Sequence, residues 1–228
     1  MDMMQQKPEP PLVRKVQVWD APTRLFHWAL VLLIGFSWLS AKKGWLDQHM
    51  LSGEAILTLL IFRIVWGFVG SDSARFTRFL RSPVEALRHL AHLPRREPDT
   101  EIGHNAAGGW MVLGMLLLLL AQAGLGLFSN DDVFTDGPLA SLVGRKTSSQ
   151  ITVWHAWLFN VILAVMALHV LAVLTYAVVK RHDLVRPMIL GWKRLPERIA
   201  PPRLGHPLLA IAVLACAAAA VYGIVHLG

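Results

Sequence analysis

The sequence alternates between long apolar runs and short polar segments. Five runs have the roughly 17–25 residues, or more, that a helix needs to cross a bilayer, and they cover residues 22–41, 49–70, 105–128, 151–179 and 206–227. Because backbone polar groups in lipid must be satisfied within the segment, each run predicts a helix rather than a strand. The fourth run is longer than a span requires, so we expect it to tilt or to extend beyond the bilayer.

The composition supports a membrane protein. Of the 228 residues, 54% are hydrophobic and only 16% are charged, which leaves too little polar surface for a soluble domain of this length. The net charge of +7 does not indicate a nucleic-acid partner, because the basic residues form short runs between the apolar segments. The single cysteine, Cys216, excludes a disulfide framework, a zinc ribbon and covalent haem attachment. We expect no removable signal peptide, because the N-terminus is polar and rich in proline.

The loops differ in charge from one side of the predicted spans to the other. Arginine and lysine are concentrated between spans two and three and between spans four and five, at Arg75, Arg78, Arg81, Arg88, Arg95, Arg96, Lys180, Arg181, Arg186, Lys193, Arg194, Arg198 and Arg203. The positive-inside rule therefore predicts a cytoplasmic N-terminus and an external C-terminus. We divide the chain into a cytoplasmic tail (1–20), a transmembrane domain (21–194) and a linker with an additional C-terminal helix (195–228).

Four histidines lie within the predicted spans or at their ends. The orientation places His49 and His155 near the outer face, and His27 and His169 near the inner face. A helix turns about 100° and rises about 1.5 Å per residue, so the fourteen residues from His155 to His169 return to within roughly 40° of the starting direction, about 21 Å further along. One helix can therefore present two imidazoles from one face at two depths.

This arrangement suits two stacked haems, each held by two histidines: His27 with His169 in an inner layer, and His49 with His155 in an outer layer. Haem iron accepts axial ligands from both sides, and a helical bundle can enclose the macrocycle. Zinc fits poorly, because it requires four clustered ligands and each layer offers two. The structural alternative is that these histidines form hydrogen bonds between helices or anchor the spans at the interface. Their pairing by depth favours ligation over that alternative.

Arg63 and Arg24 are candidates for binding haem propionates. Arg63 follows His49 by fourteen positions and so lies on a similar face at the depth of the inner layer, while Arg24 precedes His27 by three. The alternative for both is that the long side chain reaches the cytoplasmic headgroups. Six glycines would let a macrocycle approach the backbone, although small residues serve helix packing equally well: Gly53, Gly108, Gly109, Gly114, Gly124 and Gly126.

Other polar residues carry weaker signals. His104, at the start of the third span, is a candidate for a quinone pocket or a substitute ligand, but an interfacial position is the simpler interpretation. Gln122 and Asn160 are neutral polar residues that could link helices. His89, His92 and His182 fall in polar segments and indicate no site.

Several motifs together resemble the bacterial cytochrome b561 family, which includes the cytochrome b subunits of nickel-iron hydrogenases. They are VWDAPTRLFHW, HMLSGEAILTLLIFRIVWGF, GHNAAGG, WHAWLFNVILAVMALH and LVRPMILGWKR, in order between residues 18 and 194. The resemblance implies an all-α integral membrane protein with a four-helix bundle that holds two b-type haems. It assigns the ligands to His27, His49, His155 and His169. The fifth helix lies beyond this core as a packing addition or a docking surface.

We therefore expect electron transfer across a bacterial inner membrane through two bis-histidine haems. The resemblance implies that one end of the protein meets the quinone pool and that the other end meets a periplasmic c-type cytochrome or a hydrogenase. Membrane lipid and a second copy of the chain are further candidate partners. We expect no nucleic-acid partner. An alternative is a haem-dependent oxidoreductase acting on superoxide or ferric iron, with quinone as the other substrate. A haem-free transporter has little support, because no paired acidic residues lie within the spans and no broken helices recur symmetrically. The acidic segment from Ser129 could contact a basic partner, although a solvated loop explains it equally simply.

Overall fold

Five long helices dominate the structure. The computed structural model describes residues 12–96 and 98–227. Its long helices are α1 (Ala21–Lys43), α2 (Leu46–Val69), α5 (Ala106–Leu127), α6 (Arg145–Thr175, continued by the π-helical turn η2, Tyr176–Lys180) and α8 (Pro207–Leu227). All five are long and apolar enough to cross a membrane. The prediction of five helices of this length and apolar character is confirmed.

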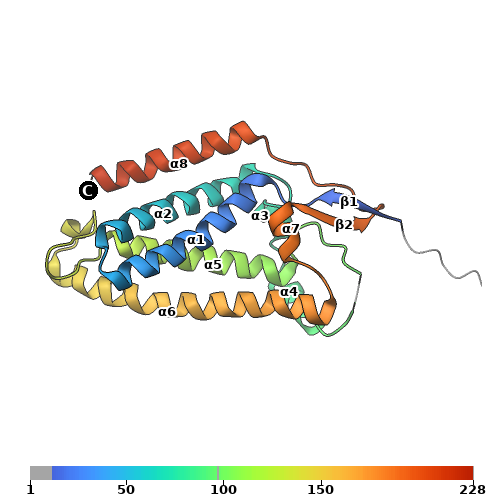
Figure 1. The fold of residues 1–228 in the computed structure, drawn as a ribbon, viewed down its shortest axis with the longest axis horizontal. Coiled ribbons are helices and arrows are strands. Elements are labelled where there is room, and N and C mark those ends of the chain that lie inside the picture. Colours follow the sequence, from blue (N-terminus) through green and yellow to red (C-terminus); the bar gives the residue numbers. More distant parts are fainter. Residues whose placement is uncertain (1–11, 97, 228) are drawn as a thin grey trace, which may run out of the picture.

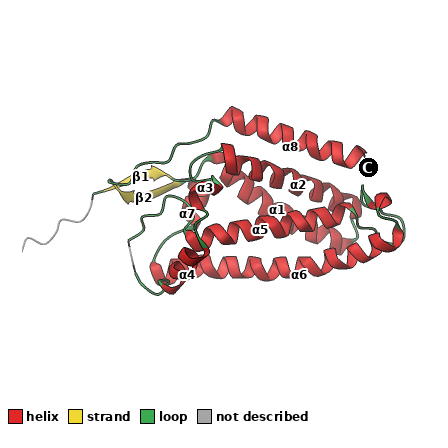
Figure 2. Cartoon of the chain, turned by 180° about the vertical axis from the view of Figure 1, so that it is seen from behind, coloured by secondary structure: helices red, strands yellow, loops and turns green. Residues whose placement is uncertain are grey.

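The helices pack as two hairpins with a fifth helix alongside. α1 packs on α2, α5 packs on α6, and contacts between α2 and α5 join the hairpins (Figure 1). The turn from α1 to α2 is tight because Gly44 adopts a left-handed conformation with φ of 73° and its N–H bonds to the carbonyl of Ala41. α8 lies along α2, outside the two hairpins, in both views (Figures 1 and 2). The chain thus places four helices around a shared interior.

The start of α6 differs from the expected boundary. The helix begins at Arg145, six residues before the apolar run at 151, so the polar stretch from Arg145 to Gln150 is helical. Gly144, with φ of 74°, starts it, and Ser149 and Thr152 contact the preceding loop. At about 1.5 Å per residue, the 31 residues of α6 extend roughly 46 Å, which exceeds a bilayer core of about 30 Å.

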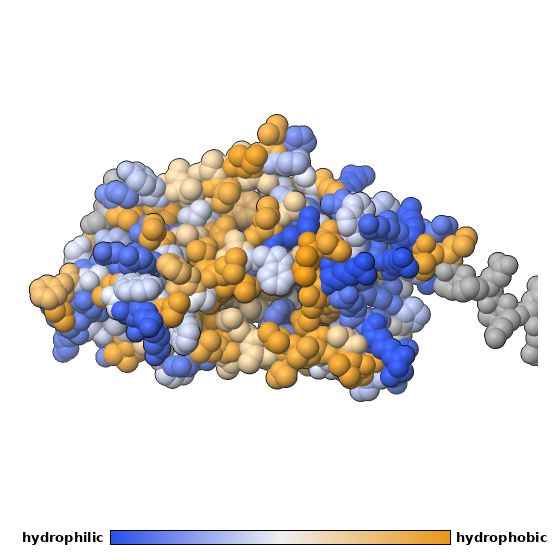
Figure 3. Space-filling view, viewed as in Figure 1, coloured by the Kyte–Doolittle hydropathy of each residue, from blue (hydrophilic) through white to orange (hydrophobic). Residues whose placement is uncertain are grey.

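Hydrophobic side chains cover the middle of the visible face, and hydrophilic residues gather towards its ends (Figure 3). Many large apolar residues of the long helices are exposed, among them Leu25, Leu32, Phe68 and Leu171. Water would penalise such a surface, whereas lipid matches it.

One end of the molecule carries structure that the apolar pattern did not predict. We call it the basic end; it holds a two-stranded antiparallel sheet and three short helices, namely β1 (Val13–Gln17), β2 (Trp192–Pro196), α3 (Phe76–Phe79), α4 (Pro83–Ala91) and α7 (Val185–Leu190). Val16 and Leu195 are buried beside Val18 and Trp19. The region expected to be only a tail therefore pairs with the segment that follows α7. A short 3₁₀ turn, η1 (Ala140–Leu142), lies at the opposite end, which we call the loop end.

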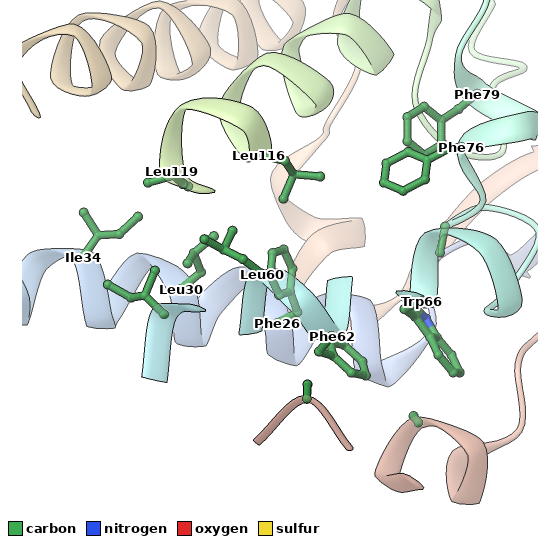
Figure 4. Close-up of a cluster of buried hydrophobic side chains, with 14 of the residues drawn as sticks. Phe26, Leu30, Ile34, Leu60, Phe62, Trp66, Phe76, Phe79, Leu116 and Leu119 are labelled. Atoms are coloured by element: carbon green, nitrogen blue, oxygen red, sulfur yellow. The ribbon is translucent and has the colours of Figure 1, made fainter. Parts of the chain in front are cut away.

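Apolar side chains fill the middle of the bundle. Leu30 and Ile34 of α1, Leu60 of α2, Leu119 of α5 and Ile162 of α6 belong to one buried cluster, and Figure 4 shows most of them converging between the helices. This cluster separates polar groups at the loop end from those at the basic end.

Candidate functional site

His49 of α2 and His155 of α6 face each other near the loop end. Their ring centroids are 6.1 Å apart and the ring planes are inclined by 86°. An imidazole nitrogen lies about 2.0–2.1 Å from a bound metal ion and the ring centroid roughly 1 Å further out, so two imidazoles on opposite sides of one ion have centroids roughly 6 Å apart. The rings of His49 and His155 therefore leave room for one metal ion between them, although the two residues are 106 positions apart in the sequence.

Backbone carbonyls fix the tautomer of both rings. Nδ1 of His49 lies 2.9 Å from the carbonyl oxygen of Ser37, and Nδ1 of His155 lies 3.0 Å from that of Gln122. A carbonyl oxygen can only accept, so each Nδ1 carries the proton and donates it. Each Nε2 then carries the lone pair, and that of His155 lies 3.2 Å from the side-chain nitrogen of Gln122. Metal-binding histidines are oriented in this way by their outer partners.

The two histidines line a cavity of about 470 Å³ that residues of α1, α2, α5 and α6 enclose. Gly53 and Gly126 form part of its wall. A Cβ at Gly53 would have no atom within 4 Å, whereas one at Gly126 would lie 3.2 Å from Cε1 of His155. Both glycines therefore keep space beside the rings free, as a planar macrocycle requires. The volume lies in the range of about 300–1,000 Å³ that is typical of ligand sites.

Two charged residues of this cavity were not singled out from the sequence. Lys42, in the last turn of α1, and Glu54, the residue after Gly53 on α2, both line it. A lysine at the rim suits the carboxylates of a haem. Glu54 could have been recognised as an acidic residue inside a predicted span, which by default indicates a functional site.

At the basic end, His27 of α1 and His169 of α6 lie close enough to interact electrostatically. Nδ1 of His27 is enclosed and has no hydrogen-bond partner among the described residues. Within residues 12–96 and 98–227, no ring contact joins His27 to His169. The rings of His27 and His169 therefore do not face each other in the way that those of His49 and His155 do.

His104 is a third histidine in this region. Its ring lies against Trp19 and Phe79, with centroid distances of 4.7 and 4.8 Å. Although part of the side chain is accessible, its Nδ1 is enclosed and lacks a partner in the described chain. Burial, followed by the nearby charges of Arg63, His169 and His27, lowers the pKa of His104 to about 3, so the ring is neutral at physiological pH. His104 thus points into the interior rather than standing at the interface.

Arg63 is enclosed by protein. It is 2% exposed, its Nη2 donates to the carbonyl of Ala74, and its guanidinium lies 5.1 Å from the ring centroid of Phe76. The part of the chain that the structure describes offers no partner for its Nη1. The alternative that Arg63 reaches the lipid headgroups is wrong, because its guanidinium is buried inside the protein. A buried cation with an unsatisfied donor suits an anionic group of a ligand.

Arg24 is held by α7. Its Nη1 donates to the carbonyl of Ile189 at 2.6 Å, and its Nε is enclosed without a partner among the residues described. A Cβ on Gly191 would lie 3.2 Å from that Nε. The side chain therefore turns toward α7, and its enclosed Nε–H is left for a further acceptor.

The neutral polar residues differ in what they contact. Nε2 of Gln122 lies 3.2 Å from Nε2 of His155, so Gln122 links α5 to α6 as predicted. Asn160 instead bonds to the carbonyl of Ala156 in its own helix, and among residues 12–96 and 98–227 it makes no hydrogen bond to another helix. His89, expected in a polar loop, lies in α4 and contacts the hydroxyl of Tyr176, which also accepts a bond from Asn105 at 2.8 Å. No pattern in the sequence indicates this contact.

The residues present fit haem better than a metal ion bound by protein alone. Across the described residues, no group of three or more His, Cys, Asp or Glu side chains could hold a metal ion. Two opposed imidazoles with lone pairs on Nε2, a glycine-walled cavity and buried cations match the needs of a macrocyclic iron with two carboxylates.

The comparisons with known proteins point the same way. The family described as prokaryotic cytochrome b561 matches residues 18–191. A relative named probable Ni/Fe-hydrogenase B-type cytochrome subunit, from Rhizobium leguminosarum bv. viciae, is 24% identical over 220 residues, which cover 81% of this chain and 91% of that protein. A relative of the same name from Azotobacter vinelandii is 25% identical over 221 residues, which cover 80% of this chain and 90% of that protein. A relative of the same name in Bradyrhizobium diazoefficiens is 23% identical over 217 residues, 80% of this chain and 87% of that protein. No solved structure gives a significant match.

Proposed function

Because this chain belongs to the prokaryotic cytochrome b561 family, we propose that it is a dihaem cytochrome b that carries electrons across a bacterial inner membrane between the quinone pool and a redox partner. The observation that supports this most strongly is the pair of opposed histidines, His49 and His155, across a cavity. Haem supplies the one-electron redox chemistry when bound. The chain supplies the ligands, their orientation and a dry path between two layers.

At the loop end, His49 and His155 would hold one haem through their Nε2 atoms. The carbonyls of Ser37 and Gln122 keep these atoms directed into the cavity. Lys42 provides a cation for a propionate, and Gly53 and Gly126 leave room for the ring.

At the basic end, His27 and His169 would hold the second haem. Arg63 and Arg24 each have a buried donor available for a propionate. His104 is neutral and lies beside this layer, so it can accept or donate a hydrogen bond there without adding a charge.

Two features favour electron transfer over chemistry at iron. If His49 and His155 both bound the haem iron, they would leave no position on it for oxygen or a substrate. The apolar cluster around Ile162 and Leu119 keeps water out between the layers. The relatives' names associate them with Ni/Fe hydrogenases, which supports a hydrogenase as the partner here, with a c-type cytochrome as the other candidate. The basic end faces the cytoplasm in this proposal.

Reconstitution into liposomes with trapped ferricyanide tests transmembrane transfer. A quinol added to the bilayer should reduce the trapped ferricyanide much faster with the wild-type protein than without it. His155→Ala, which interrupts the path at the loop end, should bring the rate close to that of protein-free liposomes. Reduction no faster with wild-type protein than in its absence would contradict the proposal.

A further inference from the structure

The loop between α5 and α6 presents an aromatic side chain at its tip. We call residues 130–136 the tip loop. Phe134 is 95% exposed and the adjacent Val133 is 64% exposed. The loop lies at the far end of the bundle from the sheet (Figure 1). Because Phe134 is almost fully exposed, its side chain is not packed in the interior of the bundle.

The tip loop is ordered by its own hydrogen bonds. Asn130 and Asp136 form an antiparallel bridge that closes it. Oδ1 of Asp131 accepts the backbone N–H groups of Val133, Phe134 and Thr135, each at 2.8 Å. These backbone bonds, with those of Thr135 and Val133 foremost, lower the pKa of Asp131. The conformation that exposes Phe134 is therefore fixed before any partner arrives, which reduces the entropic cost of binding.

The loop is also attached to the wall of the histidine cavity. The hydroxyl of Thr152 donates to the carbonyl of Asn130 at 2.9 Å, and Thr152 lies one turn before His155 on α6. Leu127 and Pro138, on either side of the loop, line the cavity itself. A partner bound at the tip loop would therefore stand beside the site at the loop end.

Exposed carboxylates flank the aromatic tip. Asp132 and Asp136 are exposed, with Asp132 held by the hydroxyl of Ser149 at 2.6 Å. Arg145 and Lys146 begin α6 nearby, but the carboxylates are the charges within the loop. Burying carboxylates in lipid is costly and an anionic headgroup would repel them, so the tip is poorly suited to the bilayer.

We propose that the tip loop is a docking site for a basic redox protein, with Phe134 entering an apolar pocket whose rim carries lysine or arginine. An ordered aromatic side chain surrounded by polar groups is the usual form of a binding hot spot. The rim charges would steer the encounter, and Phe134 would hold the complex. This proposal rests on the proposed function, because it names the chemistry of the partner that meets the haem at the loop end.

Stopped-flow reoxidation measures this docking directly. The purified protein, reduced in nanodiscs, is mixed with oxidised cytochrome c, used as a small, soluble, basic one-electron acceptor. Phe134→Ser should lower the second-order rate constant roughly tenfold or more, because an aromatic side chain is no longer buried. Asp132→Asn combined with Asp136→Asn should lower the rate at low salt and weaken its dependence on ionic strength.

Matched variants at the other end provide the control. Leu87 is 67% exposed and Glu85 is exposed, both on α4, and Leu87→Ser and Glu85→Gln should leave reoxidation by cytochrome c unchanged. Reoxidation by ferricyanide, a small anion that needs no docking, should be unchanged in Phe134→Ser, Leu87→Ser and Glu85→Gln, and should not become slower in the double Asp→Asn variant, because removing carboxylates weakens the repulsion of an anion. Rate constants are compared at equal haem concentration, and the haem bound per chain is measured separately. A wild-type protein without haem would contradict the proposed function rather than the docking site. Normal haem with unaltered cytochrome c kinetics in the loop variants would overturn the docking site.

A spin label tests the bilayer as the alternative occupant. Phe134→Cys in a Cys216→Ser background gives one labelling site at the tip. In nanodiscs the label should be relaxed by a water-soluble nickel chelate more than by oxygen dissolved in lipid. The opposite preference would place the tip in the membrane and overturn the proposal.

Discussion

A single proton on each ring decides what His49 and His155 can bind. Because the carbonyls of Ser37 and Gln122 accept from Nδ1, the lone pair of each ring is on Nε2, on the cavity side. Neither carbonyl could be identified from the sequence, since every residue has a backbone carbonyl. That His49 and His155 lie at the same end of the bundle was therefore predictable from the alternating direction of the spans, whereas the groups that orient their rings were not.

The space beside Gly53 allows a test by substitution. Gly53→Leu should fill the cavity and lower the amount of haem bound at the loop end, while the fold persists because a Cβ at this position meets no atom within 4 Å. Haem per chain and circular dichroism measure the two effects. Gly35→Leu is the matched control: Gly35 is equally unobstructed but exposed on α1, outside the cavity. Equal haem loss in both variants would show that the cavity is not the site.

The tip loop should depend on pH through Asp131. The folded state lowers the pKa of Asp131, so its stabilisation is present above the unfolded value of about 3.9 and is lost as pH falls through the lower folded value. A spin label at Phe134→Cys, with Cys216→Ser, should be ordered at neutral pH and become mobile in that acidic range. Asp131→Ala should be mobile throughout. A label equally ordered in both proteins at neutral pH would refute the role of this carboxylate.

At the scale of elements, one buried carboxylate ties several segments together. Asp20 caps α1 by accepting from the N–H of Thr23 at 2.7 Å, and it accepts from Nε1 of Trp66 at 3.0 Å and from the hydroxyl of Ser71. That hydroxyl also accepts the N–H of Gly205, which precedes α8, at 2.7 Å. The first, second and fifth long helices therefore meet at this point.

Asp20→Ala should destabilise the protein by about 2–4 kcal/mol, because it removes a cap and leaves buried donors of Trp66 and Ser71 unsatisfied. The free energy of unfolding in mixed SDS micelles gives the measurement. Asp47→Ala, which removes an exposed carboxylate from the first turn of α2, should change it by less than about 1 kcal/mol. A similar small change in both variants would mean that the Asp20 contacts contribute little.

The elements also show where sequence patterns reach their limit. The five spans were predictable because lipid permits little except an apolar helix. The pairing of β1 with β2 was not, because Val13–Gln17 contains three polar residues among five and its partner lies about 180 positions away. The burial of Arg63 was likewise hidden, since it depends on Ala74 and Phe76 folding back over α2.

At the scale of the whole molecule, polar groups are concentrated at two depths with an apolar middle. The His49 and His155 cavity occupies the loop end, and His27, His169, His104 and Arg63 gather at the basic end. Both depths share α6, whose fourteen-residue interval spans about 21 Å. Two one-electron centres so placed would connect the two faces of the membrane in two steps.

Haem stoichiometry tests this account most directly. Haem extracted from the purified protein, divided by chain concentration from amino-acid analysis, should give two haems per wild-type chain. His155→Ala and His169→Ala should each retain one, and redox titration should show that the retained haems have different midpoint potentials. A wild-type chain with one haem or none, or two variants that lose the same haem, would contradict the two-layer arrangement.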